Sequence, residues 1–182
     1  MGFLWGDSLN GYLSDMIIAQ SYALYNHQII LDRIMAIVKK LNKAKCVESI
    51  YTTHNYISVD EERPMLRKGA IDAGDGRKVC IPFNMRDGIA ICIGKGNEEW
   101  LCSAPHGAGR IMSRAQAKKQ IGLAEFQDSM AGIFSTSVCE GTLDESPQAY
   151  KPSEEILALI EPTVDVVGLV RPRLNIKDVP KS

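Results

Sequence analysis

The sequence lacks the features that would place it in a membrane or in the secretory pathway. It contains no run of about 18 or more apolar residues, the length that a transmembrane helix needs. Its first seven residues, Met1–Asp7, have neither the basic segment nor the long apolar core of a signal peptide. We therefore expect a cytoplasmic protein that has no membrane among its partners.

Cysteine is sparse, and its spacing excludes two common roles. The five cysteines form no CxxC pair, and their odd number argues against a disulfide framework. Cys80, Cys92 and Cys102 lie in apolar runs that are typical of strands. We expect them to be free thiols that are buried in the core.

Net charge is also nearly absent, since 21 basic side chains face 22 acidic ones. Bulk attraction to nucleic acid is therefore not indicated, although a few well-placed donors can bind phosphate at any net charge. The basic residues do gather in two places. These are Arg110, Arg114, Lys118 and Lys119 in one group, and Arg171, Arg173, Lys177 and Lys181 near the C-terminus.

The spacing of apolar residues predicts an α+β fold with mixed β-sheets and flanking helices. Residues 11–42 repeat apolar positions at helical spacing and predict one long helix or two joined ones. Ser113 with Gln116 forms a capping-box pattern, which predicts a helix to about Leu123. A second short helix is expected over residues 153–160, before Pro162.

Strands are expected where short apolar runs are bounded by turn residues. The 182 residues are enough for one domain spanning 1–182, with no internal boundary and no repeat. The expected strands are Cys46–Tyr51, Lys78–Pro82, Gly88–Gly94, Trp100–Ser103 and Thr163–Val170.

The segment Ser103–Arg110, with the sequence SAPHGAGR, carries the strongest chemical signal. Its glycines let the backbone approach a phosphate closely, and Arg110 can bind phosphate oxygens in a bidentate manner. The neutral imidazole of His106 beside them could attack phosphorus. Spacing alone leaves open the simpler alternative of a turn, or of a histidine whose hydrogen bonds are satisfied in the core.

The sequence HGAGR, followed by Ser113 and Arg114, resembles the signature of the RtcB family of RNA ligases. The resemblance implies that His106 accepts GMP from GTP as a covalent phosphoramide. It implies further that Gly107, Ala108 and Gly109 lie against the bound guanylate, and Arg110 matches the end of the motif.

Two earlier segments also resemble motifs of this family. His54 and Asn55 resemble an HN dipeptide, which implies a manganese ligand at His54 and a nucleotide neighbour at Asn55. A lone histidine after a strand is more often structural, and this alternative stays open. Residues 67–70 resemble an RKGA segment, which implies a part in the nucleotide and phosphate region.

A further segment stands where many RtcB members have a guanylate-binding loop of sequence Pro-Gly-Ser-Met. In this chain the four expected nucleotide neighbours are Pro82, Phe83, Asn84 and Met85. Phe83 and Asn84 replace the glycine and the serine, so the contacts of this loop with the nucleotide are expected to differ.

The C-terminal part supplies two more resemblances. Residues 145–151 resemble an EEAPxAYK-like segment, in which Tyr150 is the expected nucleotide neighbour, with a purely structural tyrosine as the alternative. Residues 171–177 resemble a terminal RPxxxxK pattern, which implies that Lys177 contacts the guanine nucleotide. Many members end in Lys-Gly, whereas Asp178 follows here.

The resemblance runs from about Tyr12 to Lys177 and corresponds to the C-terminal half of the family's fold. The family holds about two manganese ions with an Asp-x-x-Cys pair and further histidines from the N-terminal half. No equivalent is found here, where the only histidines are His27, His54 and His106. We expect a fragment, or a chain completed by a separate N-terminal half, with an exposed face that could drive self-association.

The function implied for the complete enzyme is a GTP- and Mn²⁺-dependent RNA ligase. It would join RNA 3′-phosphate or 2′,3′-cyclic phosphate ends to 5′-hydroxyl ends through the guanylylated His106. Two alternatives stay open: a non-catalytic module that binds guanine nucleotide or RNA, and a structural partner of a separate N-terminal half.

Overall fold

The computed structural model describes residues 3–59 and 64–177. Contacts group the chain into two compact units, which are described separately below. The first comprises Met1–Ser49 and Tyr56–Leu66, and the second comprises Ile50–Asn55 and Arg67–Ser182. The expectation of a single domain spanning 1–182 stays a prediction. The mixture of helices and small antiparallel sheets confirms the α+β fold class.

The first unit is dominated by helix α1 (Gly6–Asn42), a single helix of 37 residues. The predicted helical spacing is thus confirmed, without an interruption. Lys43 adopts a left-handed conformation, and its N–H bonds to the carbonyl of Lys39 at 3.3 Å, which ends the helix. Strands β1 (Tyr56–Ser58) and β2 (Met65–Arg67) pair in a two-stranded sheet.

Helix α1 has no buried residue, although much of its surface is apolar. No helix among the described residues is long and apolar enough to cross a membrane. The exposed apolar side chains of α1 include Ile17, Ile18, Tyr22, Leu24, Tyr25, Ile29, Ile30, Ile34, Ile37 and Leu41. A helix that is apolar on several faces is usually covered by other parts of a protein.

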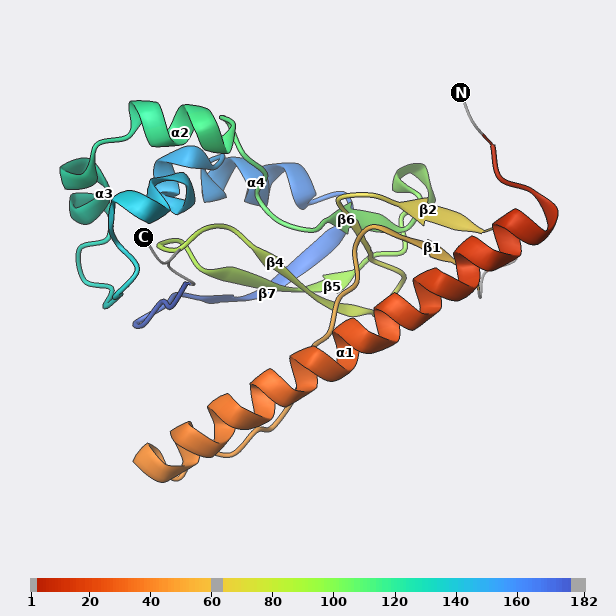
Figure 1. Cartoon of the computed structure of the whole chain (residues 1–182), viewed down its shortest axis with the longest axis horizontal. Helices are drawn as coiled ribbons and strands as arrows, with labels where there is room; N and C mark the ends of the chain where they lie inside the picture. Colours follow the sequence, from red (N-terminus) through yellow and green to blue (C-terminus); the bar gives the residue numbers. More distant parts are fainter. Residues whose placement is uncertain (1–2, 60–63, 178–182) are drawn as a thin grey trace. The chain divides into compact units, whose positions relative to one another are not determined.

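The second unit is built on the antiparallel sheet β4–β5–β7, drawn in Figure 1 with helices on one side. Its strands are β4 (Lys78–Pro82), β5 (Ile89–Gly94) and β7 (Val164–Val170), which confirms three predicted strands. Helix α4 (Ser153–Ile160) follows its predicted bounds. Its buried residues Ile156 and Ile160 join those of the sheet in one core cluster.

A second small sheet presents the segment with the chemical signal. Strand β3 (Ala70–Asp72) pairs antiparallel with β6 (Ser103–Pro105), with Ala70 opposite Pro105. The expected strand over 100–103 is wrong, because Trp100 ends the 3₁₀ helix η1 (Glu98–Trp100) and both Leu101 and Cys102 have positive φ. The strand therefore begins only at Ser103, and His106 follows its last residue.

Helices α2 (Arg114–Gln120) and α3 (Leu123–Ser129) form a second core with η2 (Glu140–Glu145) and η3 (Pro147–Ala149). The predicted capping box is confirmed, since Ser113 Oγ accepts the Gln116 N–H at 3.2 Å and Gln116 Oε1 accepts the Ser113 N–H at 3.0 Å. Helix α2 ends at Gln120 because Ile121 is extended, and Gly122 then precedes a second helix.

Two further predictions from the cysteine-bearing segments need correction. Cys46–Tyr51 forms no strand, and the side chain of Val47 is almost fully exposed. Cys92 is buried in β5 as expected, but Cys80 and Cys102 are only partly buried. Cys102 lies in the turn that follows η1 rather than in a strand. All five cysteines are free thiols.

Candidate active site

His106 lies at the end of β6 with its ring exposed and its tautomer fixed. Its Nδ1 is 2.7 Å from the carbonyl oxygen of Gly69, and its backbone N–H bonds to the same oxygen at 3.3 Å. Because a carbonyl only accepts, Nδ1 carries the proton in the neutral ring. The lone pair of Nε2 is therefore free to act as a nucleophile.

His54 stacks on His106, with the ring centroids 4.7 Å apart and the planes inclined by 13°. Desolvation lowers the pKa of His54 from its ordinary value, and the nearby charge of His106 lowers that pKa further. A lowered pKa keeps the imidazole of His54 neutral at neutral pH, which is the form that binds metals. The structure thus brings the predicted metal ligand beside the predicted nucleophile.

Asn55 holds the loop that orients His106. Asn55 has φ 62°, and its side-chain oxygen accepts the Gly69 N–H at 2.7 Å. Gly69 in turn accepts from His106, so the HN and RKGA segments support the histidine together. Asn55 does not line the cavity described next, where the other predicted nucleotide neighbours are found.

A cavity of about 730 Å³ opens beside His106 in the second unit. Pocket volumes of several hundred Å³ are typical of small-molecule sites. The cavity is lined by all the remaining predicted residues: Pro82, Phe83, Asn84, Met85, His106, Gly107, Ala108, Gly109, Arg110, Tyr150 and Lys177. Lining residues that the sequence did not single out are Gly88, Ile89, Glu145, Val170, Pro172, Leu174 and Asn175.

The glycine-containing loop after His106 packs closely on the end of β4. The Ala108 N–H bonds to the carbonyl oxygen of Pro82 at 3.0 Å, and a Cβ on Gly107 would meet that oxygen at 3.1 Å. Gly109 has φ +71°, a conformation that side chains other than glycine rarely adopt. These contacts explain why small residues follow the histidine.

Asn84 lines the cavity, but its side chain already serves the turn between β4 and β5. Its Oδ1 accepts the N–H groups of Arg86 and Asp87, both at 2.9 Å. Its Nδ2 donates to the Asp87 carboxylate at 2.8 Å. Asn84 therefore shapes the loop in this structure, and its predicted contact with a nucleotide stays a prediction.

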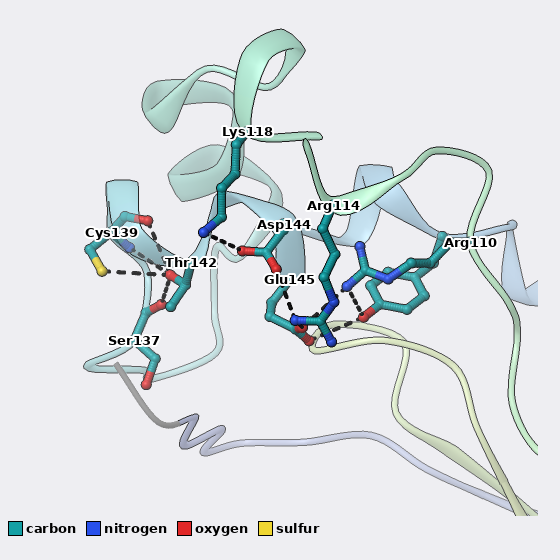
Figure 2. Close-up of polar contacts among 9 residues, drawn as sticks. Arg110, Arg114, Lys118, Ser137, Cys139, Thr142, Asp144 and Glu145 are labelled. Atoms are coloured by element: carbon teal, nitrogen blue, oxygen red, sulfur yellow. Dashed lines mark hydrogen bonds and ion pairs between the residues drawn. The ribbon is translucent and has the colours of Figure 1, made fainter. Parts of the chain in front are cut away.

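Arg110 is anchored through one nitrogen and unsatisfied at the other. Its Nη2 donates to Glu145 at 3.1 Å (Figure 2). The same nitrogen donates to the Tyr150 hydroxyl at 2.9 Å, and the guanidinium lies over the Tyr150 ring. Its Nη1 is buried without a hydrogen-bond partner. A buried donor without a partner costs free energy, and a ligand oxygen in the cavity could relieve that cost.

Glu145 gathers three of the predicted site residues around one carboxylate. Tyr150 donates to its Oε2 at 3.1 Å, and Lys177 Nζ lies 3.3 Å from the same oxygen. Desolvation, with the charge of Glu145, raises the pKa of Tyr150, so the phenol keeps its proton at neutral pH. Sequence reasoning missed Glu145 as a site residue, although it begins the segment that pointed to Tyr150.

Ser137 fixes the backbone at Lys177. The Ser137 hydroxyl donates to the Lys177 carbonyl at 2.8 Å and accepts the Lys177 N–H at 2.9 Å. Phe134 pairs with the same terminal segment through two backbone hydrogen bonds. The Phe134 N–H donates to the Arg173 carbonyl at 3.0 Å, and the Phe134 carbonyl accepts the Asn175 N–H at 2.9 Å. Ser137 is fully buried, and no sequence signal marked it.

The described residues do not by themselves form a metal centre. Among residues 3–59 and 64–177, no group of three or more histidine, cysteine, aspartate or glutamate side chains could hold a metal ion. His54 has the right chemistry for a ligand, but one or two imidazoles do not fix a transition metal. A manganese site that includes His54 would need ligands from outside the described residues.

Comparison with known proteins decides the family. A family model described as "tRNA-splicing ligase RtcB" matches residues 5–178, nearly the whole chain. The chain belongs to the RtcB family. The resemblance stated from the motifs is thereby confirmed, as is the partial RtcB-like fold.

Individual RtcB relatives match almost all of this chain but less than half of their own length. The RNA-splicing ligase RtcB of Escherichia coli strain K12 is 30% identical over 177 residues, which cover 91% of this chain and 43% of the relative. The tRNA-splicing ligase RtcB of Archaeoglobus fulgidus is 29% identical over 180 residues, covering 82% and 37% respectively. The remaining parts of these RtcB relatives have no counterpart in the match.

Proposed function

We propose that this chain carries the guanylate-accepting part of a GTP- and manganese-dependent RNA ligase. The complete enzyme joins RNA 3′-phosphate or 2′,3′-cyclic phosphate ends to 5′-hydroxyl ends. The observation that supports this best is convergence: eleven predicted residues from four separate segments line one cavity. A family name alone would not require that arrangement of the chain.

The geometry around His106 suits attack on phosphorus. In the proposed first step, Nε2 attacks the α-phosphorus of GTP, a nitrogen–phosphorus bond forms, and the bond to the β-phosphate oxygen breaks with release of pyrophosphate. The Nδ1–H bond to Gly69 stabilises the positive charge that develops on the ring. Arg110 Nη1, the unpaired donor, is available to a phosphate oxygen.

The later steps transfer the guanylate to RNA. An oxygen of the RNA 3′-phosphate attacks the phosphorus on His106, so an anhydride forms and the nitrogen–phosphorus bond breaks. The 5′-hydroxyl oxygen then attacks the 3′-phosphorus, loses its proton and displaces GMP. A 2′,3′-cyclic phosphate first requires opening by water to a 3′-phosphate.

In this proposal, manganese binds mainly through ligands that are not among the described residues of this chain. His54, with its lowered pKa, supplies one neutral imidazole beside the nucleophile. The relatives are more than twice as long as the matched region, so their additional residues are the natural source of further ligands. We therefore infer that catalysis needs a partner segment corresponding to the unmatched part of RtcB.

One observation favours a second candidate, a non-catalytic guanine-nucleotide- or RNA-binding module. The described residues contain the nucleotide cavity but no group that could hold a metal ion. Such a module would bind GTP reversibly and would leave His106 unmodified.

Incubation with GTP labelled at the α-phosphate, with manganese, separates these functions. An acid-labile, histidine-linked GMP that is absent from His106→Ala supports the ligase, whether it forms with the chain alone or only after a second chain is added. Reversible GTP binding without label transfer under both conditions supports the module. Absence of any GTP binding contradicts both.

A further inference from the structure

A second cavity, of about 280 Å³, adjoins the nucleotide cavity and carries a different charge pattern. It is lined by Arg114, Lys118, Gly141, Thr142, Asp144, Glu145 and Lys177, of which Glu145 and Lys177 also line the first cavity. None of the predicted nucleotide neighbours except Lys177 reaches it. The two cavities therefore meet at the Glu145–Lys177 ion pair.

The carboxylates at this second cavity are buried, whereas its cations are exposed. The side chain of Asp144 is only 7% exposed and that of Glu145 only 18%, against 70% for Arg114 and 48% for Lys118. At this cavity the two carboxylates face three cations, Arg114, Lys118 and Lys177, whereas Arg110, which also contacts Glu145, lines the first cavity. The solvent-facing side of the cluster therefore carries an excess of positive charge.

Helix α2 directs two of these cations to the same carboxylate. Arg114 and Lys118 are four residues apart and so lie on one face of α2. Arg114 Nη1 is 3.1 Å from Asp144 Oδ2, and Lys118 Nζ is 3.5 Å from Asp144 Oδ1 (Figure 2). Asp144 thus holds the Arg114 guanidinium and the Lys118 ammonium at the rim of the cavity. Each of these two groups keeps N–H donors that do not contact Asp144.

We propose that this second cavity binds a phosphodiester of the RNA strand whose end lies beside His106. The inference rests on the proposed function, because it needs a nucleotide in the first cavity. The two cavities share Lys177, and the exposed cations Arg114 and Lys118 line the second cavity beyond it. Preoriented guanidinium and ammonium groups are the usual ligands of phosphate oxygens, and such contacts are independent of base sequence.

Helix α2 also offers a matched control, since Lys119 is exposed and lies next to Lys118 but outside the second cavity. Single-stranded RNA with a 3′-phosphate would be titrated by fluorescence anisotropy at several salt concentrations. We expect Lys118→Gln to weaken binding by about three- to tenfold and to reduce the salt slope by about 0.7, the contribution of one phosphate contact to a single strand. Lys119→Gln should change the affinity by less than about twofold, because it removes only remote charge.

Lys118→Arg keeps the charge and should retain wild-type affinity even if Lys118→Gln loosens α2. Wild-type affinity in both glutamine variants would overturn the proposal. An equal loss of affinity in both variants, or an absence of RNA binding by the wild type, would also overturn it. Displacement of the RNA by a polyglutamate peptide at equal concentration would also overturn it, in favour of an acidic protein partner. Failure of the wild type to bind GTP would instead count against the proposed function.

Discussion

The thiol of Cys92 is fully buried in strand β5 and has no role in the candidate site. Burial, together with the neighbouring Cys80, raises the pKa of this thiol to about 11. Since the thiolate is the reactive form, Cys92 should stay protonated and unreactive up to about pH 9 in the folded protein.

Mass spectrometry after brief alkylation at pH 8 tests this expectation. Exposed Cys46 should be modified first, and Cys92 only after denaturant is added. Equal labelling of the two cysteines in the folded protein would show that the sheet is not formed as described.

At the scale of single residues, eleven of the residues predicted for the site line one cavity, and their roles stay predictions. The motif around His106 is local, so the glycines and Arg110 could be recognised as neighbours of the histidine from the sequence alone. Two contributions could not be read that way. The Ser137 hydroxyl contacts Lys177, which is 40 residues away in the sequence, and the Gly69 carbonyl contacts His106, which is 37 residues away. Such pairings depend on tertiary packing.

The start of helix α2 was predicted from the capping box that Ser113 forms with Gln116. Ser113→Ala removes the side-chain acceptor for the Gln116 N–H and should lower the free energy of unfolding by about 0.5–2 kcal/mol. Urea denaturation followed by circular dichroism measures the change. Ser113→Asp keeps an acceptor at the cap and should stay near the wild type, so equal destabilisation of both variants would contradict the cap's role.

The terminal segment before Asp178 is held by the backbone of Phe134 and, at Lys177, by the Ser137 hydroxyl. Ser137→Ala should loosen Lys177 and weaken GTP binding by about five- to thirtyfold, the cost of one or two lost hydrogen bonds of about 1 kcal/mol each. Isothermal titration calorimetry measures the affinity. Thr136→Ala is the matched control, because Thr136 is exposed one residue away, and an equal loss in that variant would exclude a specific role for Ser137.

Helices and strands were predicted correctly where the apolar pattern was long and regular, and the predictions were wrong where the pattern covered only a few residues. The apolar periodicity of α1 and the β-branched runs of β4, β5 and β7 identified those elements. The strand predicted at Cys46–Tyr51 was wrong because a segment of six residues with only a few apolar positions does not reveal whether a partner strand exists. The strand expected at 100–103 failed because the positive φ of Leu101 and Cys102 leaves no mark in residue type.

Across the whole molecule, the exposed apolar surface of α1 is the feature that most needs a partner. Ile18, Tyr22, Tyr25 and Ile29 recur at spacings of four, three and four residues, so they share one helix face. We expect the isolated chain to self-associate through this face, and a segment corresponding to the unmatched part of RtcB to suppress that association.

Sedimentation velocity at several concentrations tests this expectation. Ile18→Lys combined with Ile29→Lys should shift the chain toward monomer, while His27→Lys, at an exposed position on the opposite side of the same helix, should not. A monomeric wild type at all concentrations would contradict the prediction.

The central claim is that a guanine nucleotide binds in the cavity beside His106. Hydrogen–deuterium exchange of the intact chain, with and without GTP, tests it most directly and does not depend on a metal or on catalysis. We predict slower exchange at residues 82–89, 106–110, 145–150 and 170–177, the segments that contain the lining residues of the cavity. Protection confined to other segments, or none at saturating GTP, would contradict the account.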